Sequence, residues 1–357
     1  MIEARITKRF PPGPDSAAFS LEIDFQGGPG ITVLFGPSGA GKTLALDCIA
    51  GFTRPEQGRI LLDDQILFDA ASGVNLRPQQ RNCGYVFQNY ALFPHMTLRQ
   101  NLVFAAERHP RLERHRRVTE MLDRFHLTEV SGRRPHEVSG GQKQRCSIAR
   151  ALIGSPRLLL LDEPARGLDA PLRIELYALL RKVRSEYAVP ILLVTHDLEE
   201  CFELAEQMLI IREGRVVQSG SPRKILEQPA SAEVARLLGI SNLFEAEIAG
   251  LDPGRNTSRL RLNDYELVGT YFPGRMLGDR VWICARAEEL SAAVHNGSKL
   301  GMNQIPAKLL RVSEKPQSVR LEFSGEISVE MSRQEFERQK DNKEWLVEFP
   351  PAALRAL

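Results

Sequence analysis

The spacing of hydrophobic positions changes near residue 240 and divides the chain into two parts. Ahead of that point, short apolar runs at residues 31–35, 158–161 and 191–194 alternate with longer stretches whose apolar residues recur at helical spacing. Continuous apolar runs are typical of strands buried on both faces, and their alternation with helices indicates a parallel α/β sheet. We therefore predict an α/β domain over residues 1–239.

The same patterning places the individual elements of the first part. Residues 2–25 predict two strands around a loop rich in proline and glycine, and residues 89–155 are mostly helical. We expect this helical stretch to form a subdomain beside the sheet. Further strands are predicted at residues 58–62 and 82–87, and helices at residues 43–50, 98–134, 171–187 and directly after Ser139.

Short strand-like runs separated by turn residues dominate the chain beyond residue 240. One short helix is predicted among them, at residues 333–340. Many short strands with glycine and proline turns are typical of a small all-β barrel or sandwich. We predict a β-rich domain over residues 240–357, with strands at residues 244–248, 259–262, 280–285, 307–312, 319–323, 327–331 and 345–349.

Composition and charge narrow the classes of protein. The chain has 357 residues, 43% of them hydrophobic and 26% charged, and its formal net charge of +2 does not favour a nucleic-acid partner. Its five cysteines are scattered without a C-x-x-C pair, so we expect free thiols. No secretory signal opens the sequence, and no apolar run reaches the roughly 18 residues of a membrane span. We expect a protein of the cytoplasm.

Residues 36–43 match the phosphate-binding pattern G-x-x-x-x-G-K-[ST] between a predicted strand and a predicted helix. Glycines let backbone N–H groups close around phosphate oxygens, and a helix N-terminus adds partial positive charge. Lys42 can reach the β- and γ-phosphates, and the Thr43 hydroxyl can bind Mg²⁺. The stretch predicts a nucleoside triphosphate site made of Gly36, Pro37, Ser38, Gly39, Ala40, Gly41, Lys42 and Thr43.

Two acidic residues, Asp162 and Glu163, follow the apolar strand at residues 158–161. Parallel sheets place their ligands at the carboxyl ends of the strands, where this pair lies. Asp162 is suited to the Mg²⁺ held by Thr43, and Glu163 is suited to polarising a water in line with the γ-phosphate. A solvated acidic pair that closes a strand is the alternative, and the phosphate-binding loop makes it the weaker one.

Ser139, Gly140, Gly141 and Gln142 open a predicted helix upstream of that strand. Ser139 can cap this helix, and the two glycines leave its N–H groups accessible to an anion. With the two motifs above, the stretch resembles the signature loop of the ATP-binding cassette (ABC) ATPases. The resemblance implies that these four residues bind the γ-phosphate of an ATP held by the phosphate-binding loop of a partner subunit.

The remaining positions of the family pattern are present in order. The resemblance implies that Gln88 contacts Mg²⁺ and senses a membrane partner, that Asp169 contacts the other subunit, and that His196 lies at the γ-phosphate. Two positions depart from the pattern: Val138 replaces the usual leucine, and Arg166 stands where a small polar residue is common. We expect ATPase activity to survive both changes, and Arg166 to bear on cross-talk between subunits.

The family mechanism implies a homodimer that sandwiches two ATP molecules. Lys42 and Mg²⁺ would neutralise charge on the transferred phosphoryl group, and Glu163 would orient or deprotonate water, steadied by His196. An aromatic residue often packs against the base in front of such a domain. Phe10 is the candidate here, and a packing role at the end of a strand fits it equally well.

Residues 88–95 resemble the loop of bacterial importer ATPases whose aromatic residues help to form a groove for a membrane permease. Tyr90, Leu92 and Phe93 are the candidates, with a place in the core as the alternative. The β-rich tail resembles the TOBE/Mop regulatory domains, related to oligonucleotide-binding (OB) folds, that follow importer ATPases. The resemblance implies a peripheral subunit on the cytoplasmic face of the membrane, fed indirectly by a periplasmic or extracellular substrate-binding protein.

The cargo of the importer rests on finer likeness. Residues 30–36, 40–43 and 83–95 look most like the ATPases of molybdate importers, which predicts uptake of molybdate or tungstate. The tail is a candidate second oxyanion site, although residues 302–307 lack the hydroxyl and basic pattern associated with molybdate there. Importers of sulfate, iron, polyamine or sugar stay open, as does a soluble ABC ATPase without a permease. Co-purification with membranes through a permease would distinguish the last alternative.

Overall fold

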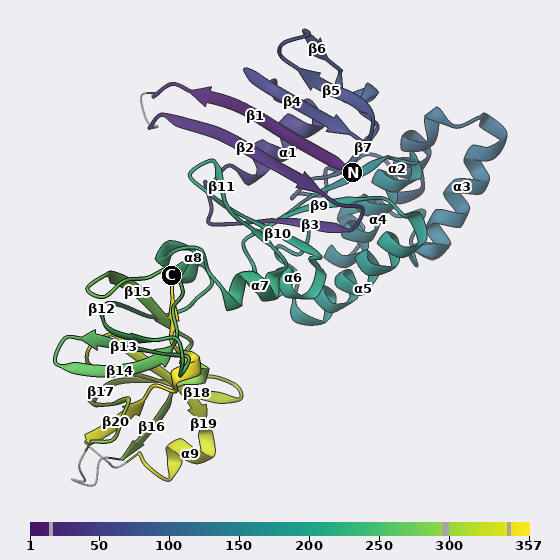
Figure 1. Cartoon of the computed structure of the whole chain (residues 1–357). Coiled ribbons are helices and arrows are strands. Elements are labelled where there is room, and N and C mark those ends of the chain that lie inside the picture. Colours follow the sequence, from purple (N-terminus) through teal and green to yellow (C-terminus); the bar gives the residue numbers. More distant parts are fainter. Residues whose placement is uncertain (14–16, 295–299, 341–343) are drawn as a thin grey trace. The chain divides into compact units, whose positions relative to one another are not determined.

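The computed structural model describes residues 1–13, 17–294, 300–340 and 344–357. These residues form two compact units, Met1–Lys224 and Ile225–Leu357 (Figure 1). The division falls within helix α7 (Pro222–Glu227), earlier than the sequence-based limit at residues 239–240, and α8 (Ala232–Leu237) belongs to the second unit. The limit of the ATPase domain in the functional sense stays a prediction.

The first unit is built on a single sheet whose strand order is β6-β5-β4-β1-β2-β11-β10-β3-β9-β8-β7. Strand β1 pairs antiparallel with both β2 and β4, and β4 pairs antiparallel with β5, so this half of the sheet is mainly antiparallel, with β11 joining β2 in parallel. The strands are β1 (Ile2–Phe10), β2 (Phe19–Gly27), β3 (Ile31–Phe35), β4 (Gln57–Leu62), β5 (Gln65–Asp69), β6 (Val74–Asn75), β7 (Cys83–Val86), β8 (Leu158–Asp162), β9 (Ile191–Thr195), β10 (Gln207–Arg212) and β11 (Arg215–Gly220).

The other half of the sheet is parallel and lies deepest in the unit. Strand β9 pairs parallel with β3 on one side and β8 on the other, and β8 pairs parallel with β7. All five residues of β3, β8 and β9 are buried, as continuous apolar runs predict for strands covered on both faces. The predicted parallel α/β core is confirmed.

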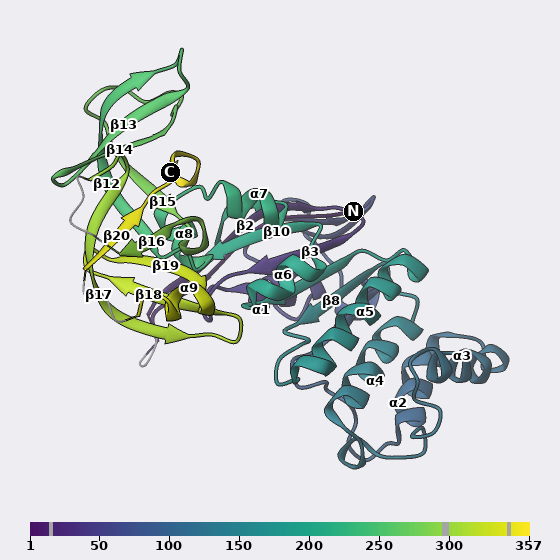
Figure 2. The same cartoon turned by 90° about the horizontal axis from the view of Figure 1, so that it is seen from below.

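Helices cover this sheet and extend it on one side. They are α1 (Lys42–Ala50), α2 (Leu98–Ala105), α3 (Arg111–Arg124), α4 (Gly140–Ile153), α5 (Ala170–Tyr187) and α6 (Leu198–Leu204). Helices α2, α3 and α4 pack against one another, and α3 lies farthest from the sheet (Figure 2). No helix within the described residues is both long and apolar enough to cross a membrane.

The helical stretch predicted over residues 98–134 was wrong in its continuity. It is broken at His109-Pro110, where Pro110 precedes α3, and α3 itself ends at Arg124. Proline has no N–H to give to a preceding turn, and His126 takes a left-handed φ of 53° that stops a helix. The short strands β5 and β6 and the hairpin β10–β11 were not predicted, because their apolar positions are few or merge with neighbouring helical patterns.

The second unit consists of two five-stranded antiparallel sheets, ordered β14-β13-β12-β15-β21 and β16-β20-β17-β18-β19. Both sheets contribute to one hydrophobic core, which includes the fully buried Trp345. The small all-β domain is confirmed, with β14, β16 and β21 beyond the predicted strands. The strands are β12 (Asn242–Asp252), β13 (Thr257–Leu262), β14 (Tyr265–Thr270), β15 (Arg280–Ala285), β16 (Ser291–Val294), β17 (Gln304–Glu314), β18 (Ser318–Phe323), β19 (Ile327–Ser332), β20 (Glu344–Glu348) and β21 (Arg355–Ala356), with helix α9 (Arg333–Glu337) between β19 and β20.

Candidate nucleotide-binding site

Four adjacent parallel strands end at one edge of the sheet and deliver the predicted site residues together. In the order β7-β8-β9-β3, the segments after these strands carry Gln88, Asp162 with Glu163, His196 and the loop at residues 36–43. The carboxyl edge of a parallel sheet is where α/β proteins bind ligands. Residues that lie far apart in sequence therefore meet because their strands are neighbours.

The loop at residues 36–43 connects β3 to α1 and depends on its glycines. Gly39 and Gly41 have φ values of 81° and 96°, in the left-handed region that other residues avoid. A Cβ atom on Gly36 would lie 2.1 Å from the Ile211 carbonyl oxygen. Nothing lies within 4 Å of the corresponding position on Gly39, so the loop is open on that side. This is the form of a phosphate cradle at a helix N-terminus.

Lys42 lies inside the curve of this loop. Its Nζ donates to the carbonyl oxygens of Gly36 and Pro37 at 2.8 and 2.9 Å, and only 5% of the residue is exposed. Burial lowers the pKa of Lys42, while the nearby carboxylates of Glu163 and Asp162 act in the opposite direction. The ammonium is thus a desolvated cation, the kind of group that binds a phosphate strongly.

Thr43 and Asp162 form the part of the site suited to a metal ion. The Thr43 hydroxyl donates to Asp162 Oδ1 at 2.9 Å, and burial raises the pKa of Asp162. Mg²⁺ is usually bound by one or two carboxylates together with substrate phosphates. In the described residues no group of three or more His, Cys, Asp or Glu could hold a metal alone. The oxygens of this pair therefore fit a Mg²⁺ that arrives with a nucleotide.

Glu163 has an unusual backbone and two charged neighbours. Its φ is 45°, its Oε1 lies 3.0 Å from His196 Nδ1, and its Oε2 accepts from Arg166 Nη1 at 2.9 Å. Burial acts to raise the pKa of Glu163, but the hydrogen bonds from His196 and Arg166 outweigh it and hold the pKa below its ordinary value. Glu163 is therefore an ionised carboxylate next to a histidine, an arrangement able to accept a proton from water.

Gln88 reaches the same group from the neighbouring strand. In the amide orientation that satisfies its partner, the Gln88 side-chain oxygen accepts from Arg166 Nε at 3.0 Å and also from Nη1. Sequence reasoning placed Gln88 at the metal and Arg166 at the subunit boundary. The contact between them was missed, because no local pattern links a residue after β7 to one after β8.

The signature residues form a separate group. Ser139 caps α4: its Oγ accepts from Gln142 N at 3.3 Å, and its N donates to the Gln142 side chain at 3.0 Å. A Cβ atom on Gly141 would lie 2.9 Å from Leu172, near the start of α5. In the part of the chain that the structure describes, no hydrogen bond or ion pair joins Ser139, Gly140, Gly141 or Gln142 to the loop at residues 36–43.

Asp169 lies beside this group, at the start of α5. Its side chain caps the helix by accepting from Leu172 N at 3.1 Å. In the same chain, then, Asp169 serves helix α5 and the signature serves helix α4. Both would need a second chain to take part in a nucleotide site.

A second aromatic residue, Phe19, lies beside the phosphate-binding loop, and the role of Phe10 at the base stays a prediction. Phe10 ends β1, is 37% exposed and lies under the Lys8 ammonium, 5.5 Å from the ring centre. Phe19 pairs with it across the hairpin, and its ring would lie 2.9 Å from a Cβ atom on Gly41. From the sequence only Phe10 was predicted, because no local pattern shows that the Phe19 ring packs beside Gly41.

Comparison with known proteins decides the family. A family model described as "ABC transporter" matches residues 21–166. The Rhodospirillum rubrum protein named "Molybdenum import ATP-binding protein ModC" is 37% identical to this chain over 304 residues, which covers 85% of this chain and 82% of that protein. The chain belongs to the ABC ATPases. Among them it is of the importer type, as the similarity over both units indicates.

Other ABC ATPases of importers are similar to this one to a comparable degree. The Vibrio cholerae protein named "Spermidine/putrescine import ATP-binding protein PotA" is 39% identical, covering 76% of this chain and 70% of that protein. The solved structure of a dimeric ATP-binding cassette in a post-hydrolysis state, bound to ADP and Pi, matches with a TM-score of 0.54 and 26% identity. That match covers 62% of this chain and 99% of the cassette. The ABC ATPase described here thus carries one cassette followed by a β domain.

Proposed function

We propose that this ABC ATPase works as a homodimer whose hydrolysis of ATP powers import of an oxyanion, molybdate or tungstate, through a separate membrane permease. The observation that carries the ATPase role is the convergence of Lys42, Glu163 and His196 at one sheet edge. The likeness to molybdenum import proteins over most of the chain supports the cargo. The similarity to polyamine and sulfate import proteins makes those cargoes the alternatives.

The proposed chemistry assigns each side chain one task. Lys42 leaves the loop carbonyls and binds the β- and γ-phosphates, while the backbone N–H groups of residues 36–43 hold the remaining oxygens. Glu163 accepts the proton of the attacking water, and His196 holds the carboxylate in place through the contact at 3.0 Å. Mg²⁺ bound near Thr43 and Asp162 supplies charge neutralisation at the phosphates. Each step resembles phosphoryl transfer by other P-loop enzymes.

A homodimer follows from the separation of the two halves of the site. In the described residues no hydrogen bond joins the signature at residues 139–142 to the loop at residues 36–43, and a second chain would complete each ATP site. The similarity to a dimeric cassette supports this arrangement. Closure on ATP and reopening after hydrolysis would supply the motion that drives transport.

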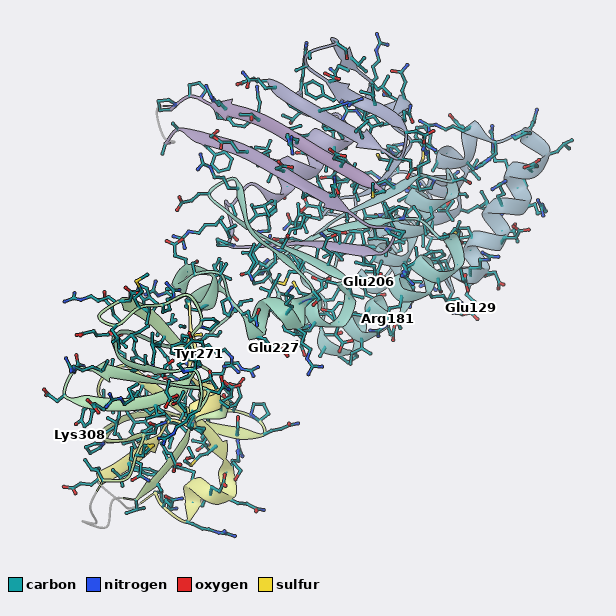
Figure 3. All side chains as sticks on the ribbon, viewed as in Figure 1. Glu129, Arg181, Glu206, Glu227, Tyr271 and Lys308 are labelled. Carbon is teal, nitrogen blue, oxygen red and sulfur yellow. The ribbon has the colours of Figure 1, made fainter. Side chains whose placement is uncertain are left out.

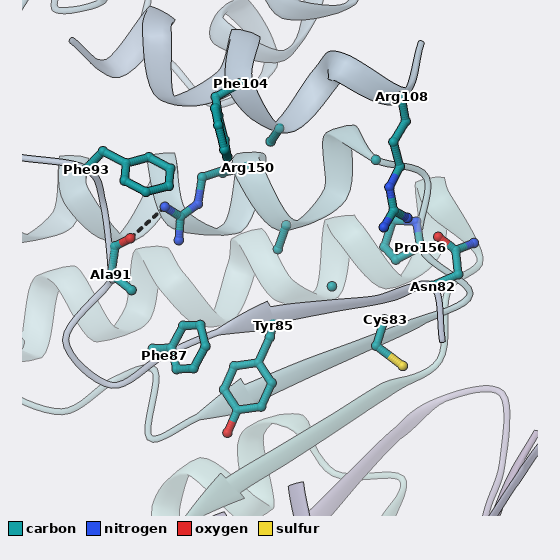
Figure 4. Close-up of a pocket in the computed structure, with 14 residues that line it drawn as sticks. Asn82, Cys83, Tyr85, Phe87, Ala91, Phe93, Phe104, Arg108, Arg150 and Pro156 are labelled. Atoms are coloured by element: carbon teal, nitrogen blue, oxygen red, sulfur yellow. Dashed lines mark hydrogen bonds between the residues drawn. The ribbon is translucent and has the colours of Figure 1, made fainter. Parts of the chain in front are cut away.

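A groove in the first unit is the proposed docking place of the permease. It has a volume of about 380 Å³ and lies between β7 and helices α2 and α4 (Figure 4). Aromatic side chains line it, and Phe52, which is 52% exposed, stacks on one of them with ring centres 5.8 Å apart. A groove of this size that combines aromatic with basic and polar side chains suits a short amphipathic helix of a partner. Its labelled lining residues are Asn82, Cys83, Tyr85, Phe87, Ala91, Phe93, Phe104, Arg108, Arg150 and Pro156.

The second unit is proposed to regulate the ATPase rather than to take part in hydrolysis. Binding of an oxyanion by this unit stays a prediction. Asn303, in the stretch at residues 302–307, is 4% exposed and bonds to backbone groups of Val268 and Phe349. It cannot serve an oxyanion without giving up those bonds, so a site in this unit would have to use other residues.

Uptake of labelled molybdate and sulfate into cells that lack the gene tests the proposal. The cells carry either the wild-type chain or the Glu163→Gln variant, which keeps the size of the side chain and removes its ability to take a proton. Molybdate uptake restored by the wild type alone supports the proposed cargo and the motor together. If the wild-type chain restores only sulfate uptake, the cargo is sulfate rather than molybdate. If the protein is absent from membrane fractions that contain importer permeases, the transport role is excluded.

A further inference from the structure

Arg166 contacts two residues of the proposed hydrolytic site at once. Its Nη1 lies 2.9 Å from Glu163 Oε2, and its Nε lies 3.0 Å from the side-chain oxygen of Gln88. The guanidinium carries five N–H donors in a planar fork, so a single arginine can serve both acceptors. A serine side chain at this position would be too short to do so.

The backbone around Arg166 favours this arrangement. Arg166 N donates to the Glu163 carbonyl oxygen at 3.1 Å and closes a turn, which begins at the left-handed Glu163. Gly167 follows with a φ of 76°, and the chain then continues toward α5. The turn brings the side chains of residues 163 and 166 together, so their ion pair needs little further ordering.

These contacts compete with the tasks proposed for the partners of Arg166. One Glu163 oxygen faces His196 and the other accepts from Arg166, so the guanidinium takes up part of the hydrogen-bonding capacity of the carboxylate. The Gln88 oxygen accepts from the guanidinium, and this bond competes with coordination of a nucleotide-bound cation. For Glu163 and Gln88 to act as proposed, at least part of this set of bonds must break.

We propose that Arg166 is a positioning residue that latches Glu163 and Gln88 together in the nucleotide-free protein and is displaced when the ATP-bound dimer forms. This inference rests on the function proposed above. The Arg166 side chain is 58% exposed, so it can move into solvent without leaving a buried charge. Exposed ion pairs contribute little free energy, and the latch therefore slows hydrolysis rather than blocking it.

Gln88 also connects this latch to the groove. Arg150, which lines the groove, donates to the carbonyl oxygens of Ala91 and Tyr90 at 2.6 and 3.2 Å. Both of these residues have left-handed φ values, so the loop after Gln88 is held in a bent form by contacts made in the groove. A partner segment that shifts this loop would draw Gln88 away from Arg166.

Steady-state hydrolysis by the purified full chain provides the first test. Arg166→Ser should raise kcat about two- to five-fold, the range expected for loss of an exposed ion pair, and leave KM for ATP unchanged. Arg166→Lys keeps the positive charge but lacks the planar guanidinium. Its kcat should lie between those of the wild type and Arg166→Ser. The matched control is Arg181→Ser on α5, which removes a surface ion pair with Glu203 at 2.9 Å (Figure 3).

ATP-driven dimerisation provides a second test that does not depend on hydrolysis. In a Glu163→Gln background, sedimentation gives the ATP concentration at which half of the chains are dimeric. Adding Arg166→Ser should lower that concentration, because the bond to Gln88 no longer has to break. The same Arg166→Ser change should have no effect on that concentration in a chain that already carries both Glu163→Gln and Gln88→Ala. In that chain neither partner of Arg166 remains.

Three results would overturn the latch. The first is a fall in kcat with Arg166→Ser, which would make Arg166 an aid to hydrolysis. The second is a change no larger than that of Arg181→Ser, and the third is a dimerisation effect that persists without both partners. A wild-type chain that hydrolyses no ATP would instead refute the proposed function, and the dimerisation assay would still decide on the latch.

Discussion

Buried polar side chains with opposite roles can be compared between the two units of the protein. In the second unit, Asn303 donates to the carbonyl oxygens of Val268 and Phe349 at 2.8 and 2.7 Å and accepts from the Val268 amide at 2.6 Å. In the first unit, Lys42 and Asp162 are each only 5% exposed, yet they keep ionisable groups whose pKa values burial shifts toward the neutral form. The first set is neutral and holds strands together, whereas the second is charged and faces a ligand site.

The difference separates side chains that stabilise the fold from side chains that the fold holds for chemistry. Buried charges cost free energy unless they are compensated, and binding of a phosphate with its metal would supply that compensation. A change at the nucleotide edge should therefore cost activity more than stability. A change at a buried amide of the second unit should do the reverse.

The largest expected effect lies at the nucleotide edge. Glu163→Gln should lower kcat by about 10²–10⁴-fold, because the proton acceptor is lost. The melting temperature should fall only slightly, since the change removes the pairing of Glu163 with the exposed Arg166 but also its repulsion with Asp162. Phosphate release and thermal unfolding of the same preparation measure both quantities. A large drop in melting temperature would mean that Glu163 also holds the fold, and the comparison between the units would fail.

A buried arginine in the first unit provides the counterexample that sharpens the comparison. Arg81 is 0% exposed and donates to the carbonyl oxygens of Cys48 and Ile49, at the end of α1, at 2.7 and 2.8 Å. Arg81→Met should lower the free energy of unfolding by about 3 kcal/mol, because it leaves buried acceptors unpaired. The exposed Arg77→Met in the same segment is the control. Equal effects of the two variants in urea titrations would contradict this reasoning.

The contribution of the Asn303 hydrogen bonds to stability can be measured by comparison with Asn263, which has a similar backbone conformation. Asn303 and Asn263 both adopt left-handed φ values, 62° and 50°, but only Asn303 is buried. Asn303→Ala should cost about 2 kcal/mol more than Asn263→Ala, because the backbone strain is shared and the lost hydrogen bonds are not. Both tryptophans, Trp282 and Trp345, lie in this unit, so their fluorescence follows its unfolding. Similar costs would show that strain alone decides.

The smallest expected effect is the loss of stability of the second unit at low pH. Burial acts to raise the pKa of Glu289, but hydrogen bonds from Arg355 and Arg286 lower it from 4.5 to about 2. A carboxylate with a depressed folded pKa contributes stability above its unfolded value and loses it as the pH falls. Tryptophan fluorescence should therefore show the second unit weakening between pH 4.5 and 2. Glu289→Gln should flatten this dependence, and an unchanged slope would exclude the network as its cause.

The order of motifs and the alternation of strands and helices were predictable from the sequence. Buried parallel strands have a continuous apolar pattern, and their carboxyl ends fix where residues such as Asp162 and His196 meet. The register of the sheet then brings Gln88 beside them, as the family pattern implied. These features depend on local sequence and on a topology that strand–helix alternation already indicates.

Other features depend on contacts that no local pattern encodes. The place of Phe19 beside Gly41 follows from tertiary packing, and the bonds of Arg166 follow from the pairing of β7 with β8. The half-polar strands β14 and β16 escaped prediction because short alternating runs resemble turns. Pro110 indicates the break before α3 in the sequence. The helical spacing of the apolar residues around it nevertheless led to the prediction of one continuous helical stretch.

The separation of the signature from the phosphate-binding loop has a genetic consequence. In the proposed dimer, each ATP site takes its loop from one chain and its signature from the other. A chain defective at Lys42 and a chain defective at Ser139 would therefore form mixed dimers with one doubly defective site and one intact site. Two alleles that are each inactive alone could then complement one another in the same cell, whereas two alleles with lesions at Lys42 could not.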